Sequence, residues 1–260
     1  MRKKALLAVS FGTSHPRTLD RTIGAIEGAL ARDFAEHDLF RAFTSPTVIR
    51  KIKEAFGEDV PNVPQALRLL EEKGYSEVIL QPTHILNGFE YEKILRQAKP
   101  FETVFERLAY GAPLLSSQED MDAAAALLNG LAAECAEDTA LVFMGHGTEH
   151  AVNPVYKKLD SLLRENSFLG TVESEPTLEQ VLSKVKAAPG FRRVILQPFM
   201  IVAGDHACND MASDEPDSWK SCFEAEGYET SCRLKGLGEY ESVRSLFIRH
   251  ARNAIEKGMN

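Results

Sequence analysis

The sequence has few cysteines, no long apolar run and no excess of basic charge, and each of these absences excludes a class of protein. Its four cysteines show no CxxC spacing, which argues against a zinc knuckle or a disulfide framework and favours reduced thiols in the cytoplasm. No run of about 18 apolar residues occurs, so we expect neither a transmembrane helix nor a membrane partner. The formal net charge of −8 argues against a nucleic-acid partner.

Signals for export and for nucleotide binding are missing as well. The basic start, Met1–Lys4, leads into an apolar stretch without a small-residue cleavage site, so we expect no signal peptide. Neither GxGxxG nor the P-loop pattern GxxxxGKS/T occurs, and Gly236–Gly238 is interpreted as a strand-to-helix turn. We therefore expect no ATP and no dinucleotide as cofactor.

The feature that organises the chain is an internal repeat. VILQPTHILNG begins at Val78 and VILQPFMIVAG begins at Val194, an offset of 116. Gly74 and Gly190 have the same offset, whereas Gly12-Thr13 and Gly147-Thr148 match at an offset of 135. The chain is thus predicted to be two similar halves, the first longer by about 19 residues (135 minus 116), which we place in the segment 45–62.

Each half alternates short apolar strands with amphipathic helical patterns, which favours an α/β fold with a parallel four-stranded sheet flanked by helices in each half. The predicted strands are Ala5–Ser10, Leu39–Ala42, Val78–Gln81 and Thr103–Leu108, then Leu141–Met144, Leu169–Glu173, Val194–Gln197 and Glu229–Leu234. We expect domains at residues 1–136 and 137–260, with the last helix, Tyr240–Lys257, packing back on the first. Loops at the carboxyl ends of the strands would line a cleft between the halves.

Three ionisable residues lie at or just beyond the ends of predicted strands in the second half: His146 in FMGHGTEH, Glu173 in VESEP and His206 in GDHACND. Two imidazoles and a carboxylate are a ligand set for a divalent first-row metal, and three protein ligands leave coordination positions free. Taken singly, each histidine can equally be a hydrogen-bonding loop residue. Glu173 can equally be a charge at a helix N-terminus, and Glu175 competes with it for the ligand role.

Several motifs resemble the anaerobic sirohydrochlorin cobaltochelatases of cobalamin biosynthesis: SFGTS, FRAFTS, NGFEYEKI, FMGHGTEH, VESEP and AGDHACNDMASDEPDSWK. The resemblance extends over nearly the whole chain and implies a class II chelatase fold of two Rossmann-like halves with no nucleotide requirement. It also implies that His146, Glu173 and His206 hold the metal and carry the catalysis. The implied reaction is insertion of Co²⁺ into sirohydrochlorin or precorrin-2.

Metal insertion replaces two pyrrole N–H protons, so the site must present the metal and accept protons. Neutral imidazoles can do both near pH 7, whereas clustered thiolates would retain the metal. We expect further tetrapyrrole-binding residues at strand ends: Ser10, Phe11, Gly12, Thr13, His84, Leu86, Asn87, Gly88, Glu90 and Gly204. Asn209, Asp210 and Ser213 are expected to cap a helix or support a ligand. Arg50 and Lys51 are either contacts for substrate carboxylates or a solvated helix face.

Other functions fit parts of this pattern. Iron insertion for sirohaem needs the same ligands, so the sequence does not separate Fe²⁺ from Co²⁺. A non-catalytic carrier would bind metal or tetrapyrrole without turnover. A zinc hydrolase would need a general base beside the metal, for which Glu149 or Glu175 could serve. The sequence does not fix the oligomeric state, and a homo-oligomer is one of the alternatives.

Overall fold

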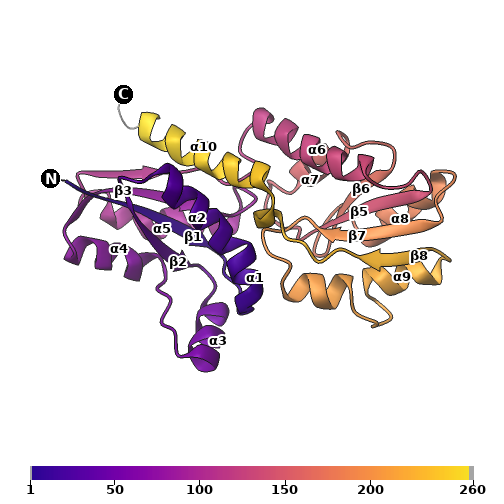
Figure 1. Ribbon diagram of the computed structural model, residues 1–260, viewed down its shortest axis with the longest axis horizontal. Coiled ribbons are helices and arrows are strands. Elements are labelled where there is room, and N and C mark those ends of the chain that lie inside the picture. The colour runs from indigo at the N-terminus through magenta and orange to yellow at the C-terminus, as the bar shows by residue number, and fades with distance from the viewer. Residues whose placement is uncertain (1, 258–260) are drawn as a thin grey trace. The chain divides into compact units, whose positions relative to one another are not determined.

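The computed structural model describes residues 2–257 and divides the chain into two compact units. The first unit is formed within Met1–Ser116 and Gly238–Asn260, and the second unit is Ser117–Leu237. Each has its own four-stranded sheet with helices on both faces (Figure 1). The prediction of an α/β fold with two parallel four-stranded sheets is confirmed.

The sheet of the first unit has the strand order β2-β1-β3-β4, and every neighbouring pair is parallel. Its strands are β1 (Lys3–Ser10), β2 (Asp38–Phe43), β3 (Tyr75–Pro82) and β4 (Arg107–Tyr110). Its helices are α1 (Pro16–Arg21), α2 (Ile23–Asp33), α3 (Pro46–Phe56), α4 (Val63–Glu72), α5 (Phe89–Ala98), the short 3₁₀ turn η1 (Lys99–Phe101) and α10 (Glu241–Lys257).

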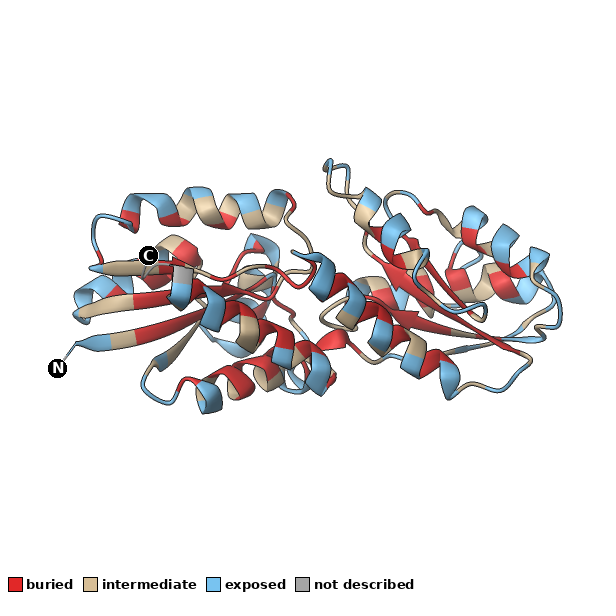
Figure 2. Cartoon of the chain, turned by 90° about the horizontal axis from the view of Figure 1, so that it is seen from above, coloured by how far each residue is buried: buried red, intermediate tan, exposed pale blue. Residues whose placement is uncertain are grey.

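The alternation of side chains along β1 explains why both faces of this sheet are covered. Ala5, Leu7 and Val9 pack with buried residues of α4 and α5, while Leu6 and Ala8 point to the opposite face. Helix α10 packs beside α2. Arg252 of α10 donates hydrogen bonds of 2.9 and 2.6 Å to the carboxylate of Asp33 in α2. Figure 2 shows the central strands as largely buried toward their carboxyl ends and the outer helix faces as largely exposed.

The second unit repeats this topology with the strand order β6-β5-β7-β8, again parallel throughout. Its strands are β5 (Thr139–Gly145), β6 (Ser167–Thr171), β7 (Arg193–Pro198) and β8 (Glu229–Cys232). Its helices are α6 (Gln118–Ala133), α7 (Pro154–Asp160), α8 (Leu178–Ala187), the π-helical turn η2 (Ala207–Met211) and α9 (Trp219–Ala225), and the 3₁₀ turn η3 (Leu237–Glu239) begins where the unit ends.

The repeated residues occupy equivalent places in the two units. β3 lies between β1 and β4, and β7 lies between β5 and β8. Gly74 and Gly190 precede these two strands and have φ of 75° and 96°. A positive φ is a conformation that glycine adopts without strain. The additional segment of the first unit contains α3, which begins after the Ser45 cap and ends at Gly57 with φ of 70°.

The strands predicted at β1, β2, β3, β5 and β7 lie within the observed ones, whereas those predicted at β4, β6 and β8 extend beyond them, and β8 ends at Cys232 rather than at Leu234. β4 begins at Arg107 rather than at Thr103, because Phe101 and Phe105 enter the core from a turn and not from a strand. β6 ends at Thr171 rather than at Glu173, because the Thr171 amide bonds the Pro176 carbonyl at 2.7 Å and closes a turn.

The boundary between units also differs from the one expected at 136/137, because α6 lies in the second unit. Asn129 of α6 donates a hydrogen bond to the Leu162 carbonyl at 3.0 Å and accepts one from the Arg164 amide at 2.8 Å. These bonds join the helix to the segment that leads into β6.

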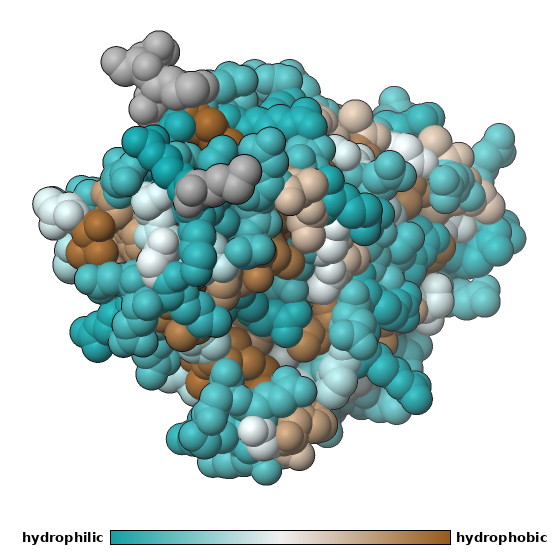
Figure 3. Space-filling model, turned by 60° about the vertical axis from the view of Figure 1, so that its left-hand side comes forward, coloured by the Kyte–Doolittle hydropathy of each residue, from teal (hydrophilic) through white to brown (hydrophobic). Residues whose placement is uncertain are grey.

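Hydrophilic side chains predominate on the face shown in Figure 3, and apolar ones form small separate patches. None of the helices described is both long enough and apolar enough to cross a bilayer. The four cysteines, Cys135, Cys208, Cys222 and Cys232, are all free thiols.

Candidate metal site

The second unit brings His146, Glu173 and His206 together at one edge of its sheet. His146 directly follows β5, Glu173 comes two residues after β6, and His206 follows the loop that leaves β7. Because β6, β5 and β7 are adjacent and parallel, their carboxyl ends meet at the same edge. This is where open α/β sheets bind ligands.

Main-chain hydrogen bonds hold the first two of these residues beside each other. The Val172 amide bonds the Gly145 carbonyl at 3.1 Å, and the Glu173 amide bonds the His146 carbonyl at 2.9 Å. Hydrogen bonds between the two chain segments therefore continue beyond the last paired residues of β5 and β6, Gly145 and Thr171. As a result, Nδ1 of His146 lies 3.4 Å from Oε2 of Glu173.

Gly147 permits this close approach. Its φ is +84°, and a Cβ atom there would lie 2.8 Å from Oγ1 of Thr171 and 2.9 Å from the Ser174 nitrogen. The Thr171 hydroxyl in turn donates a 2.6 Å hydrogen bond to the Ser174 carbonyl, which shapes the loop that carries Glu173. A side chain at position 147 would push this loop away from His146.

Gly145 has a comparable role on the inner side of the site. A Cβ atom there would meet the Tyr156 ring at 2.7 Å, so glycine lets α7 pack against the end of β5. Burial raises the pKa of Tyr156 to about 12. The phenol therefore stays protonated at neutral pH, and Tyr156 supports the site as a packed, uncharged ring.

His206 reaches the site from the helical segment that begins after Gly204. The Cys208 amide bonds the Gly204 carbonyl at 3.0 Å, and the π-helical turn η2 follows His206 directly. The His206 ring lies edge-to-face with the His146 ring, with centroids 4.6 Å apart and planes at 84°. Its Nδ1 atom lies 2.6 Å from Oδ2 of Asp210.

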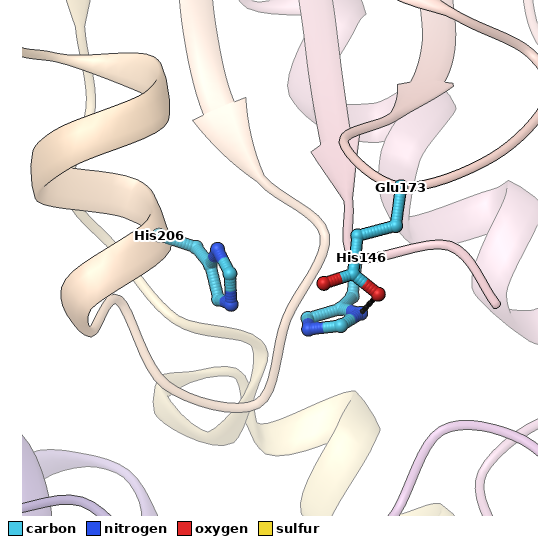
Figure 4. A group of neighbouring side chains, drawn as sticks. All are labelled: His146, Glu173 and His206. Atoms are coloured by element: carbon cyan, nitrogen blue, oxygen red, sulfur yellow. Dashed lines mark ion pairs between the residues drawn. The ribbon is translucent and has the colours of Figure 1, made fainter.

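The three side chains converge on one point (Figure 4). One ligand atom from each lies within 4.8 Å of the others, and this is the group of metal-ligand type found among residues 2–257. Ligand atoms at about 2.1 Å from a shared ion are separated by at most about 4.2 Å, so small side-chain rotations bring all three into range. The side chains are 44%, 53% and 41% exposed respectively, which leaves access for an incoming molecule.

Glu175 lies outside this group. Its backbone carbonyl accepts a 2.8 Å hydrogen bond from the Asn153 side chain, whose Oδ1 accepts one from the Thr148 amide. Asn153 thus ties the loop of Glu173 to the loop of His146. Asn209 is exposed, and its backbone carbonyl accepts a hydrogen bond from Ser213 at 2.6 Å. Its side chain makes no hydrogen bond with the residues that the structure describes, so the expected capping or supporting role of Asn209 is not found.

The predicted residues of the first unit gather at the corresponding edge of its own sheet. Ser10 and Thr13 are buried, and the Ser10 hydroxyl accepts a 2.7 Å hydrogen bond from Thr83. Phe11 is 52% exposed. Gly12 has φ of +101° and lies so close to the Phe43 ring that a Cβ atom would be 2.7 Å from it. Leu86 and Asn87 are half-buried, and Gly88 is the N-cap residue of α5.

His84 and Glu90 form a polar cluster with Lys93 in the first unit. His84 Nε2 lies 3.5 Å from the Thr44 hydroxyl, whereas its Nδ1 is buried without a hydrogen-bond partner. Burial is the main reason that the pKa of His84 falls to about 4, and this outweighs the opposite effect of Glu90. Lys93 donates to the Thr44 carbonyl at 2.9 Å and lies 3.5 Å from Oε1 of Glu90.

Arg50 lies on the exposed helix α3, where it pairs with Glu54 at 3.8 Å. This favours the interpretation of that segment as a solvated helix face. Sequence reasoning missed Gly145, Gly147 and Asn153 as residues that shape the site. The pattern G-H-G was the available signal, because glycines on both sides of a strand-end histidine indicate close packing there.

The fold of this chain matches the folds of solved structures of SirB and CbiX. The structure of SirB from Bacillus subtilis with Fe³⁺ matches with a TM-score of 0.66 at 18% identity, over 99% of this chain and 98% of that chain. The structure of CbiX, described as the terminal enzyme for biosynthesis of siroheme in denitrifying bacteria, matches with a TM-score of 0.58 at 15% identity, over 96% and 99%. At these identities the likeness shows the fold.

The sequence comparisons are more specific. The family model of the cobalt chelatase CbiK matches residues 4–256. The chain is 42% identical over 256 residues to the sirohydrochlorin cobaltochelatase of Salmonella typhimurium, covering 97% of both chains. It is 33% identical over 261 residues to the sirohydrochlorin cobaltochelatase CbiKC of Nitratidesulfovibrio vulgaris, covering 98% and 92%. The chain therefore belongs to the CbiK cobalt chelatase family.

Proposed function

We propose that the protein inserts Co²⁺ into sirohydrochlorin, without a nucleotide, and that His146, Glu173 and His206 hold the metal during transfer. The observation that carries the proposal is the convergence of these three side chains at one sheet edge. Family membership supports the reaction, because the relatives in Salmonella typhimurium and Nitratidesulfovibrio vulgaris are named sirohydrochlorin cobaltochelatases.

The donor set suits a metal that must be released. Imidazole and carboxylate are borderline and hard ligands, so they bind Co²⁺ without the tight hold of clustered thiolates. Three protein ligands leave positions on the metal to which ring nitrogens can bind before the protein ligands dissociate. The Glu173 carboxylate offsets one of the two positive charges of the ion.

Proton balance assigns a second task to the same region. Each insertion replaces two pyrrole N–H protons by one Co²⁺, so two protons must leave with every turnover. Neutral imidazoles can accept protons near neutral pH. His146 and His206 are half-exposed, so water can take these protons onward.

We further propose that the polar and aromatic residues at the strand ends of the first unit bind the tetrapyrrole. They are Ser10, Phe11, Gly12, Thr13, His84, Leu86, Asn87, Gly88 and Glu90, and Gly204 of the second unit joins them in this role. Exposed Phe11 offers a flat apolar surface for a macrocycle. Glu90 offers a carboxylate oxygen, Oε2, that is buried without a hydrogen-bond partner.

The test is an anaerobic absorbance assay with purified protein, Co²⁺ and metal-free sirohydrochlorin in excess over protein. We expect the spectrum of the cobalt complex to appear much faster than without protein, over many turnovers, and at the same rate with and without ATP. A rate equal to that of the protein-free reaction would refute the enzymatic role. A single stoichiometric turnover would instead identify a carrier.

Insertion of Fe²⁺ is the second candidate function. The ligand set supports it, since two imidazoles and a carboxylate accept Fe²⁺ as well as Co²⁺. The same assay with Fe²⁺ separates the two functions. A larger kcat/KM for Fe²⁺ than for Co²⁺ would assign the protein to sirohaem formation.

A further inference from the structure

The Nδ1 atom of His206 has a carboxylate partner of its own. It lies 2.6 Å from Oδ2 of Asp210, four residues further along the chain. His206 immediately precedes the turn η2, and Asp210 lies within that turn. Residues four apart on a helical segment lie on one face, so this pair forms within a single element.

The chemistry of the acceptor fixes where the ring proton lies. An ionised carboxylate accepts hydrogen bonds and donates none, so Nδ1 of His206 carries the hydrogen and Nε2 keeps its lone pair. His146 shows the same arrangement with a different acceptor, because its Nδ1 lies 3.0 Å from the Gly147 carbonyl oxygen. Both imidazoles therefore present Nε2, and in Figure 4 each ring directs one nitrogen toward the other ring.

We propose that Asp210 is a positioning residue of the metal site: it holds His206 in the Nδ1–H tautomer and fixes the ring so that Nε2 faces Co²⁺. This inference rests on the proposed function in taking His206 as a metal ligand. A carboxylate that accepts from the outer nitrogen of a ligating histidine orients the ring and strengthens it as a ligand. The contact of Asp210 is with Nδ1 of His206, so it acts on the metal through the ring.

Comparison of the two repeats indicates that Asp210 is not needed for the fold of this segment. At the offset of 116, His206 corresponds to Glu90 and Asp210 corresponds to Ile94. Ile94 is fully buried in α5, so the equivalent segment of the first unit forms around an apolar side chain. Asp210, by contrast, has a side chain that is 42% exposed, and its replacement by a smaller residue opens no core cavity.

The first test measures binding of Co²⁺ alone, without tetrapyrrole, to the full-length protein. We expect Asp210→Ala to weaken Co²⁺ binding by about 10- to 100-fold. Asp210→Asn should weaken it less, because the amide oxygen still accepts from Nδ1–H. Asn209→Ala removes an exposed polar side chain from the same turn and serves as the matched control, with affinity like that of the wild type. Circular dichroism of each variant checks the fold.

The second test reads the tautomer directly by NMR of ¹⁵N-labelled histidine in the metal-free protein, with His206→Ala used to assign the signal. The wild type and Asn209→Ala should show Nδ1–H at His206, and Asp210→Ala should lose this preference. A purely structural role of Asp210 would not change the tautomer. Unchanged Co²⁺ affinity in Asp210→Ala, or an Nε2–H tautomer in the wild type, would overturn the proposal.

These experiments distinguish a failure of the role of Asp210 from a failure of the proposed cobalt-insertion function. If Co²⁺ binds with the expected order of affinities but sirohydrochlorin is not metallated, the catalytic role fails while the role of Asp210 stands. If His206→Ala binds Co²⁺ as tightly as the wild type does, the metal site and the role of Asp210 fall together.

Discussion

The backbone amide of Glu173 donates a 2.9 Å hydrogen bond to the carbonyl oxygen of His146. The same two residues also meet through their side chains, with Nδ1 of His146 3.4 Å from Oε2 of Glu173. Two candidate ligands that follow different strands are thus held beside each other by a main-chain hydrogen bond. His206 belongs to a separate segment. Substitutions at the three candidate ligands should therefore have different effects.

Replacement of either histidine by alanine should abolish cobalt insertion. His146→Ala and His206→Ala each remove one imidazole from a half-exposed position, so the free energy of unfolding should change by less than about 1 kcal/mol. Anaerobic insertion assays and thermal unfolding measure the two effects. Wild-type turnover by either variant would exclude that histidine from the mechanism.

The two neighbouring carboxylates should differ in importance. Glu173→Gln keeps the shape of the side chain but removes the charge beside the metal, whereas Glu175 lies outside the ligand group. We expect Glu173→Gln to weaken Co²⁺ binding more than Glu175→Gln, as measured by titration with Co²⁺. The opposite order would mean that Glu175 is the ligand.

Gly147→Ala should disrupt the site through crowding. The new methyl group would lie 2.8 Å from Oγ1 of Thr171 and 2.9 Å from the Ser174 nitrogen, and would separate the Glu173 loop from His146. Gly190→Ala is the matched control, because Gly190 also has a positive φ, 96°, but no atom within 4 Å of the added carbon.

Both substitutions strain the backbone and should lower stability by roughly 1 kcal/mol or more. Only Gly147→Ala should also lose most of its Co²⁺ affinity and insertion rate. Equal activity of the two variants would show that the contact between these loops is not needed for metal binding.

His84 should make stability depend on pH. Burial lowers its pKa to about 4 in the folded protein, whereas the unfolded chain has a value of about 6.5. Between these values the unfolded chain binds a proton that the folded protein does not, so stability falls as the pH drops through this window. Above about 6.5 the contribution vanishes, because His84 is neutral in both states.

His84→Gln should remove this contribution. Its free energy of unfolding should fall less steeply than that of the wild type between about pH 6.5 and 4, by roughly 1 kcal/mol per pH unit. Urea unfolding of both proteins across this range measures the difference. Parallel pH dependences would show that His84 titrates normally in the folded state.

The fold could be predicted from the sequence largely because the chain repeats itself. The central strands β1, β3, β5 and β7 are continuous apolar runs that pack on both faces, so their positions were predicted closely. The edge strand β4 was misplaced because Phe105 is apolar and buried, like a strand residue, yet it lies in the turn before the strand. Helix α6, which we expected in the first half, lies in the second unit, where Asn129 bonds residues that come later in the chain.

The candidate ligands could be predicted from their positions after strands, but the contacts around them could not. The crowding at Gly147 depends on Thr171 and Ser174, which lie far from it in sequence. The buried Nδ1 of His84, which has no hydrogen-bond partner, likewise depends on packing against distant residues such as Thr44, 40 positions away in sequence. Such contacts follow from tertiary packing, which no local pattern encodes.

The most direct measurement is the anomalous diffraction of a crystal soaked with Co²⁺, recorded at the cobalt absorption edge. We predict one strong peak at bonding distance from Nε2 of His146, Nε2 of His206 and a carboxylate oxygen of Glu173. A cobalt peak bound elsewhere, or at this edge of the sheet but without both imidazoles, would contradict the account.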